Sequence, residues 1–359
     1  MNMPRRQLLA TSLATVALTP AGQSVAMDTE AIEVVADGFA QTQNFNGVIA
    51  VAIAGRPTMS KAYGVSDVRN QSPASTASTY AIGSISKWFT AAMVLRLAEI
   101  GLLRLDTPLS TLLPDFPTSS GATVTLAHLL SNTSGLPDLL MPAAKANSDL
   151  RTSNASAGEM VSRFAPTETK FVPGSDFDYA FMNWVIVRAV IEAQTGAGFE
   201  DLAESLLFKP MGLANTGIAS RGFEGVPGLV PAFDGQTVAA QSDMSTCYGY
   251  GAASGTFYSD AADLLTFADR LLSGSLLTPQ SKSELLKVRY LREGYALGGR
   301  VRVGSAGPVA WETGSVGGYK SLLTYRPSDR RSVVVLNNTD MSQTTINDFA
   351  ASIFDLPSV

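Results

Sequence analysis

The chain has 359 residues, of which 45% are hydrophobic and 16% charged, a composition typical of a globular protein and unlike that of a disordered one. Its formal net charge of −5 disfavours nucleic acid as a partner, because binding to nucleic acid requires basic patches. Cys247 is the only cysteine, which excludes an internal disulfide, and His128 is the only histidine, which excludes a histidine-rich zinc site. We therefore expect a fold that depends on its core and uses no metal and no cofactor.

The first 26 residues have the pattern of an export signal. Arg5 and Arg6 precede a weakly apolar run over 8–18, and the small residues Ser24 and Ala26 follow it. The run is too short to span a membrane, and the paired arginines favour a twin-arginine signal; the alternative is a frayed N-terminal helix. We predict removal of residues 1–26, which leaves 24 basic and 31 acidic residues, a balance of −7. The mature protein is then periplasmic or secreted, with no stable membrane insertion.

The first predicted element is an amphipathic helix over 31–43. A β-hairpin follows, with strands over 47–54 and 58–65 around a turn at 55–57. A loop over 70–79 then leads to a helix from about Ser84 to Ile100, in which apolar residues recur every three to four positions.

The middle of the chain, from about 104 to 250, has few strand patterns and reads as helices and loops, with one clear helix over 183–195. Another helix is predicted over 260–273. Four strand-like runs follow, over 297–303, 308–313, 319–325 and 332–337. A final helix is predicted over about 341–354.

Strands near both ends of the chain with helices between them predict an α+β fold. We expect one antiparallel sheet flanked by the terminal helices, with a mostly helical lobe inserted. The predicted catalytic domain covers 27–359. Its α/β lobe comprises about 27–85 and 255–359, and its helical lobe about 86–254.

Ser84 and Lys87 are the first candidate catalytic residues, because a spacing of three places them on one face of a helix. A serine hydroxyl attacks only when a base takes its proton, and a lysine is a base only when it is uncharged. Burial among Ile85, Trp88 and Phe89 would lower the lysine pKa from its usual value of about 10.4. The unpaired backbone N–H of Ser84 in the first helical turn could also donate to an oxyanion.

The run from Thr79 to Lys87 resembles the nucleophile segment of the serine β-lactamase and penicillin-binding protein superfamily. The resemblance is strongest to the branch of class C β-lactamases, D-alanyl carboxypeptidases and family VIII esterases, and it covers about 35–355. Further segments match in the same order: Gly101–Pro114, His128–Asp138, Phe208–Ile218 and Ala252–Leu272.

The resemblance implies a Tyr-x-Asn motif after a Pro-Gly turn, here Pro173-Gly174. Tyr179 takes the tyrosine position and is expected to relay a proton between Ser84 and the leaving group. Phe181 stands at the asparagine position and is expected to contact substrate. Asn183 lies two residues further on another helical face, so we do not expect it to replace the missing amide.

The resemblance also implies a Lys/His-Thr-Gly motif on a strand edge, which here reads Glu312-Thr313-Gly314. These residues are expected to bind substrate, with the backbone N–H of Ser315 as the second oxyanion donor. Glu312 puts a possible negative charge where the family has a positive or neutral group, which would disfavour anionic β-lactams. The alternative is that Glu312 points away or pairs with an arginine such as Arg300 or Arg302.

The remaining candidates have weaker support. His128 lacks an evident acidic partner, and the resemblance implies a structural role for its segment. Cys247 is expected to be a small packing residue at the core or the junction of the lobes. The aromatic residues Tyr248, Tyr250, Tyr258 and Trp311 fit either a cleft lining or the core.

The sequence therefore predicts a serine hydrolase that forms an acyl-enzyme on an ester, amide or peptide and is esterase- or peptidase-like rather than an efficient β-lactamase. A β-lactamase or D-alanyl carboxypeptidase is one alternative, and a non-catalytic binding protein on the same fold is the other. The sequence does not indicate an oligomeric state.

Overall fold

The computed structural model describes residues 21–234, 237–238, 249–304 and 306–354. Its main element is a six-stranded antiparallel sheet of order β10-β11-β12-β13-β1-β2. The strands of this sheet are β1 (Gly47–Ile53), β2 (Arg56–Tyr63), β10 (Arg300–Gly304), β11 (Gly307–Val316), β12 (Tyr319–Arg326) and β13 (Arg331–Asn337). Since β1 pairs with β13, the N-terminal hairpin joins the C-terminal strands in one sheet, and the predicted α+β fold is confirmed.

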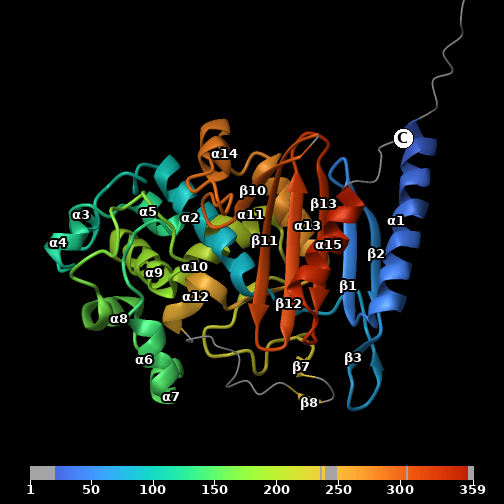
Figure 1. Cartoon of the computed structure of the whole chain (residues 1–359), viewed down its shortest axis with the longest axis horizontal. Coiled ribbons are helices and arrows are strands. Elements are labelled where there is room, and N and C mark those ends of the chain that lie inside the picture. Colours follow the sequence, from blue (N-terminus) through green and yellow to red (C-terminus); the bar gives the residue numbers. More distant parts are fainter. Residues whose placement is uncertain (1–20, 235–236, 239–248, 305, 355–359) are drawn as a thin grey trace, which may run out of the picture.

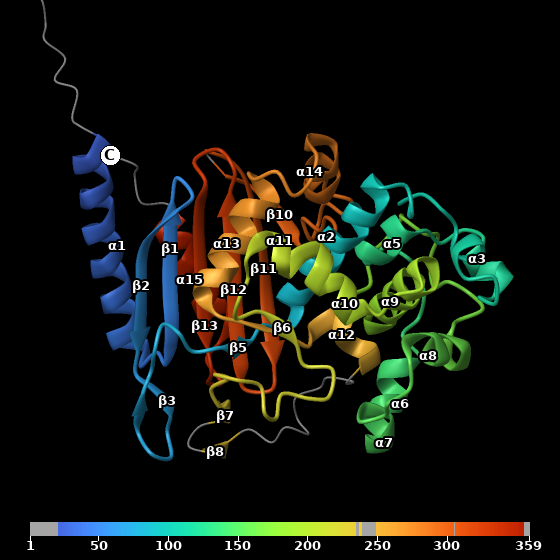
Figure 2. The same ribbon diagram turned by 180° about the vertical axis from the view of Figure 1, so that it is seen from behind.

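Both faces of the sheet are buried. In β1, Ile49 and Val51 face a core shared with α1 (Ala21–Gln43) and α15 (Gln343–Phe354), whereas Val48 and Ala50 face the larger core. Successive side chains of a strand point to opposite faces, so a strand buried on both sides is apolar throughout. Figure 1 shows α15 in front of the sheet, and Figure 2 shows α13 (Ala261–Leu272) on the opposite side.

The helices between the two parts of the sheet gather beyond β11 and β10 (Figures 1 and 2). They are α2 (Ser86–Glu99), α3 (Leu109–Leu112), α4 (Thr118–Gly121), α5 (Leu126–Leu130), α6 (Leu140–Ala146), α7 (Ser148–Arg151), α8 (Ala157–Phe164), α9 (Phe181–Thr195), α10 (Phe199–Ala203), α11 (Lys209–Met211), α12 (Ala252–Gly255) and α14 (Pro279–Leu286). Short helical turns are η1 (Gly83–Ile85), η2 (Glu204–Phe208) and η4 (Gly249–Gly251). Short strands are β3 (Val65–Asp67), β4 (Ser72–Pro73), β5 (Tyr80–Ala81), β6 (Gly217–Ile218), β7 (Phe233–Asp234), β8 (Thr237–Val238) and β9 (Phe257–Ser259).

The predicted export signal lies mostly outside the described residues. Helix α1 begins at Ala21 and continues through the predicted end of the signal at residue 26, so the helix is longer than the predicted 31–43. Among the helices of the described residues, none combines the length and the apolar character needed to cross a bilayer.

Helix α2 is the central helix of the fold. Eleven of its residues are buried, including both polar Ser86 and charged Lys87, because other elements enclose it on all sides. The helix begins at Ser86, two residues later than predicted, after the 3₁₀ turn η1 that carries Ser84. The Ser86 hydroxyl donates to the carbonyl of Gly83 at 2.6 Å and accepts from the N–H of Phe257 at 3.2 Å, which holds the start of α2 against β9.

Strand β11 passes so close to η1 that two glycines are required. Gly83 has a φ of +50°, and a Cβ there would lie 2.7 Å from the nitrogen of Ser315. A Cβ at Gly314 would lie 2.0 Å from the carbonyl oxygen of Ile82. Glycine within a strand often marks such a close backbone approach. The strand predicted over 308–313 therefore extends to Val316.

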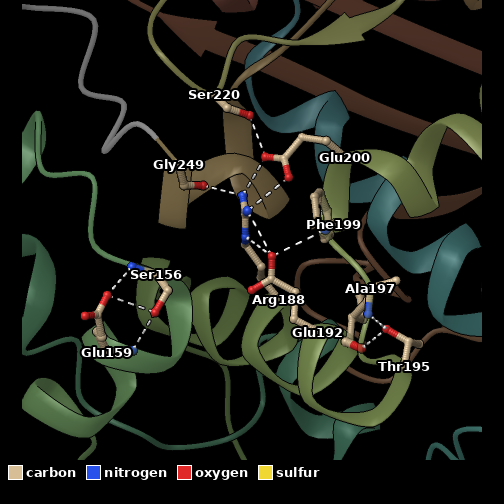
Figure 3. Close-up of polar contacts among 11 residues, drawn as sticks. Ser156, Glu159, Arg188, Glu192, Thr195, Ala197, Phe199, Glu200, Ser220 and Gly249 are labelled. Atoms are coloured by element: carbon tan, nitrogen blue, oxygen red, sulfur yellow. Dashed lines mark hydrogen bonds and ion pairs between the residues drawn. The ribbon is translucent and has the colours of Figure 1, made fainter.

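A buried arginine, Arg188, connects neighbouring helices through ion pairs and a hydrogen bond (Figure 3). Arg188 of α9 pairs with Glu192 at 2.9 Å and with Glu200 at 3.0 Å, and donates to the carbonyl oxygen of Gly249 at 2.5 Å. Glu200 also accepts from the hydroxyl of Ser220 at 2.5 Å. Because Gly249 opens the turn that leads into α12, this network fixes α12 relative to α9.

We predict that Gly83→Ala lowers the free energy of unfolding by roughly 2–4 kcal/mol, since the new Cβ adds a backbone clash to an unfavourable φ. Gly101→Ala is the matched control: Gly101 has a φ of +80° but open space around its Cβ position, so about 1 kcal/mol is expected. Urea unfolding of both variants measures the difference. Equal losses would show that the approach of β11 to η1 is not tight.

Candidate active site

Ser84, Lys87 and Tyr179 meet at the floor of a pocket. The Ser84 hydroxyl oxygen lies 3.1 Å from the Lys87 Nζ and 2.8 Å from the Tyr179 hydroxyl. Ser84 and Lys87 come from the η1–α2 junction, and Tyr179 lies just before the first turn of α9. The structure thus brings together the three side chains to which the sequence assigned catalytic roles.

Lys87 is enclosed and has few polar partners. The residue is 4% exposed, and its Nζ donates to the carbonyl oxygen of Ser254 at 2.5 Å. The rings of Tyr179 and Trp184 lie 5.0 and 5.5 Å from the same nitrogen. Burial lowers the pKa of Lys87 to about 7; the Glu312 carboxylate opposes this shift and the Arg300 guanidinium adds to it. Near neutral pH much of the amine is therefore uncharged and able to accept a proton.

Tyr179 remains a neutral phenol at neutral pH. Burial, followed by the charge of Glu312, raises the pKa of its hydroxyl, and the hydrogen bond with Ser84 opposes the shift. The Tyr179 residue as a whole is 42% exposed, and it lines the pocket. Its edge packs on the ring of Tyr295, with centroids 6.2 Å apart. A phenol in contact with Ser84 can donate a proton as well as pass one on.

The pocket above these residues has a volume of about 250 Å³. Its walls come from η1, α2, α6, α9, α12 and β11, with Gly83, Ser84, Lys87, Asp138, Met141, Tyr179, Phe181, Gly251, Ser254, Gly255, Ser315 and Val316 as lining residues. Within this lining, Lys87 is the only basic side chain and Asp138 the only acidic one.

Two backbone segments meet beside the Ser84 hydroxyl. The nitrogen of Ser315 lies next to Gly83, and both Ser84 and Ser315 line the pocket. Closeness of the two segments is one requirement for a pair of oxyanion-binding amides. The use of these two N–H groups in catalysis stays a prediction.

Phe181 lines the pocket and its ring packs edge-on against Tyr250 at 6.3 Å. Its backbone N–H donates to Asp138 at 2.7 Å, and this carboxylate caps the first turn of α9. Asn183 is fully buried and bonds to Ser134 at 2.7 Å, away from the pocket. Asn183 therefore does not replace the missing motif amide.

The expectation that Glu312 binds substrate is wrong, because Glu312 does not line the pocket. Its side chain is 1% exposed and pairs with Arg300 at 2.8 Å, while the N–H of Thr313 donates to the same carboxylate at 2.8 Å. Of the two interpretations, pairing with an arginine is the one that the structure shows. The pocket lining includes neither Thr313 nor Gly314, and Gly314 packs against Ile82 instead. The expected repulsion of anionic substrates by Glu312 has no geometric basis.

The weaker candidates take structural positions. His128 forms a capping box with Thr125 at the start of α5, and its Nδ1 accepts from the Thr125 N–H at 3.3 Å. Cys247 and Tyr248 lie outside the described residues. The other aromatic candidates are absent from the pocket lining: Tyr250 donates to the carbonyl oxygen of Leu150, Tyr258 packs on Gly217, and Trp311 lies under Arg300.

Sequence reasoning missed several lining or supporting residues, among them Ser254, Trp184 and Asp138. Ser254 acts through its backbone carbonyl, so its side chain gives no signal. Trp184 lies at a core position of a predicted helix, and the sequence does not distinguish it from any other core residue of that helix. Asp138 ends the segment His128–Asp138, which the resemblance covered without assigning a role to its last residue. Within the described residues, no group of three or more His, Cys, Asp and Glu residues could hold a metal ion.

Comparison with known proteins identifies the family of the chain. The beta-lactamase family profile matches residues 32–352. Penicillin-binding protein 4* of Bacillus subtilis (strain 168) is 24% identical over 317 residues, 84% of this chain and 69% of the relative. The chain spans 58% and 69% of the length of the first two curated relatives that it matches.

Solved structures have the same fold. The hydrolase EstCE1, described as having promiscuous acyltransferase activity, is 21% identical with a TM-score of 0.75, covering 93% of this chain and 99% of its own. A D-stereospecific amidohydrolase from Streptomyces sp. is 26% identical with a TM-score of 0.70, covering 91% and 98%. The family profile covers most of the chain, and the chain therefore belongs to the beta-lactamase family.

Proposed function

We propose that the protein is a serine hydrolase that acts on esters or amides through an acyl-enzyme formed on Ser84. The observation that carries the proposal is the contact of the Ser84 hydroxyl with an enclosed Lys87 amine at 3.1 Å and with the Tyr179 phenol at 2.8 Å. A hydroxyl, a base of matched pKa and a proton donor within hydrogen-bond reach satisfy the needs of nucleophilic catalysis.

In the proposed acylation, the Ser84 oxygen attacks the substrate carbonyl carbon while its proton passes to the uncharged Lys87 amine. Lys87 already donates one N–H to the Ser254 carbonyl, which holds the amine within 3.1 Å of the Ser84 oxygen. The tetrahedral oxyanion is held by the N–H groups of Ser84 and Ser315. When the bond to the leaving group breaks, Tyr179 donates a proton to that group and recovers one from Lys87. Water then releases the acyl group by the reverse route.

We propose a neutral acyl group as the preferred substrate. Among the pocket-lining residues, the only basic side chain is Lys87, whose amine is needed uncharged, and Asp138 adds a carboxylate. A substrate carboxylate would find no dedicated cation in this lining. This supports an esterase- or peptidase-like activity over efficient β-lactam hydrolysis.

The comparisons support the reaction class and leave two alternatives. Among the neighbours, one is described as a hydrolase with acyltransferase activity and one as an amidohydrolase, whereas the curated relative is a penicillin-binding protein. A β-lactamase or D-alanyl carboxypeptidase would use the same three side chains. A binding protein without catalysis would form no covalent adduct. Export through the N-terminal signal remains part of the proposal.

We predict that the mature protein gains the mass of one phosphonyl group when incubated with a fluorophosphonate, and that it hydrolyses a neutral p-nitrophenyl ester faster than it is acylated by a penicillin. Intact-mass spectrometry and ester turnover measure both. Ser84→Ala should abolish the adduct and lower turnover by at least 10³-fold. An adduct that persists in Ser84→Ala would move the nucleophile elsewhere, and no adduct with any reagent would favour the binding protein.

We predict that kcat/KM for ester hydrolysis rises with pH and levels off above an apparent pKa of about 7, because only the uncharged Lys87 amine accepts the serine proton. Below that value, the rate should fall by about tenfold for each pH unit. A pH–rate profile from pH 5 to 9 measures this limb. A rate that keeps rising toward pH 10 would mean that Lys87 is an ordinary ammonium group or that it is not the base.

A further inference from the structure

The ion pair between Glu312 and Arg300 is withdrawn from water. The Glu312 carboxylate accepts two hydrogen bonds from the Arg300 guanidinium, at 2.8 and 3.0 Å, and a third from the N–H of Thr313 at 2.8 Å. The side chains of Glu312 and Arg300 are 1% and 18% exposed. Because little solvent screens them, these two charges act strongly on each other and on their neighbours.

The segment that carries Arg300 lies against the residue that carries the catalytic amine. A Cβ at Gly298 would lie 2.4 Å from the carbonyl oxygen of Lys87, and a Cβ at Gly299 would lie 2.6 Å from the Nε1 of Trp88. The two glycines thus allow the backbone before β10 to touch the first turn of α2. Arg300 follows immediately, which brings the ion pair within electrostatic reach of Lys87.

A second connection runs through an aromatic ring. The guanidinium of Arg300 lies 5.0 Å from the ring centroid of Tyr295, which is fully buried. The Tyr295 ring packs edge-on against the Tyr179 ring at 6.2 Å, and Tyr179 contacts Ser84. The ion pair therefore contacts, through one ring, the side chain that orients the nucleophile.

The two charges act on Lys87 with opposite sign. The Glu312 carboxylate raises the pKa of Lys87 and the Arg300 guanidinium lowers it. Glu312 likewise raises the pKa of Tyr179, and Arg300 lowers it. The other titratable groups around the amine are the phenols of Tyr179 and Tyr295 and the Asp138 carboxylate across the pocket. Glu293 lies outside the pair, 3.9 Å from Arg300, with its side chain 46% exposed.

We propose that the Arg300–Glu312 ion pair is a positioning element of this active site: it lies beside the first turn of α2 and against the Tyr295 ring, and its two charges act on the Lys87 amine in opposition. Glu312 then serves the reaction without touching the substrate. The inference rests on the proposed function, because it assigns the pair to the reaction of Ser84.

The test is the pH dependence of the rate at which a fluorophosphonate labels Ser84, measured for Glu312→Gln, Arg300→Gln and the double variant. Glu312→Gln leaves Arg300 unopposed, so its acid limb should move to lower pH by about one unit. Arg300→Gln leaves Glu312 unopposed, so its limb should move to higher pH by about one unit. The double variant should return to within about half a unit of the wild type.

The controls separate charge from structure. Glu293→Gln removes an exposed carboxylate outside the pair and should leave the limb in place. Glu312→Asp keeps the charge but shortens the side chain, so it should shift the limb in the same direction as Glu312→Gln and by less. If Glu312→Gln does not fold, Arg300→Gln decides the matter. Circular dichroism checks the folding of every variant.

Folded single variants whose limbs stay in place, or move in the same direction, would overturn the inference and leave the ion pair as structural support. If Glu312→Gln does not fold, an unmoved limb in Arg300→Gln would have the same consequence. Failure of the wild-type protein to label at Ser84 would instead overturn the proposed function. The two failures are therefore distinguishable.

Discussion

The burial of one lysine amine beside one serine hydroxyl is the constraint on which the rest of this structure depends. An ammonium group withdrawn from water loses far more hydration free energy than its neighbours restore, so it releases its proton more easily. Lys87 is 4% exposed and its pKa falls to about 7, which makes it a base matched to neutral pH. A protein without a catalytic histidine in its pocket can still activate a serine in this way.

The fold provides that burial through contacts from distant parts of the chain. Helix α2 lies within the larger core, the Ser254 carbonyl accepts from the amine, and the tryptophan of α9 covers it. On the other side, β11 lies so close to η1 that only glycine fits at position 83. The Arg188 network fixes the turn that leads to α12, so the position of the Ser254 carbonyl depends on residues far from the pocket.

Much of this arrangement was predictable because it has local signals. The spacing of Ser84 and Lys87 is one helical turn, and the hydrophobic periodicity predicted the six strands of the main sheet and helices α2, α9, α13 and α15 within a few residues. The sequence left the position of Glu312 open between the pocket and an ion pair with Arg300 or Arg302, because the pairing depends on the register of β10 and β11. Gly314 was expected to bind substrate, whereas it allows a close contact with Ile82. The Ser254 carbonyl has no sequence signal, since every residue carries one.

The protonation of Lys87 itself is the most direct test of this account. Carbon-13 NMR of the lysine Cε, with the Lys87 signal assigned by its loss in Lys87→Met, follows that protonation without any substrate. The account predicts a midpoint near pH 7 in the folded wild-type protein. A midpoint near the ordinary lysine value of 10.5 would contradict it, because the amine would then be charged at neutral pH and unable to accept the serine proton.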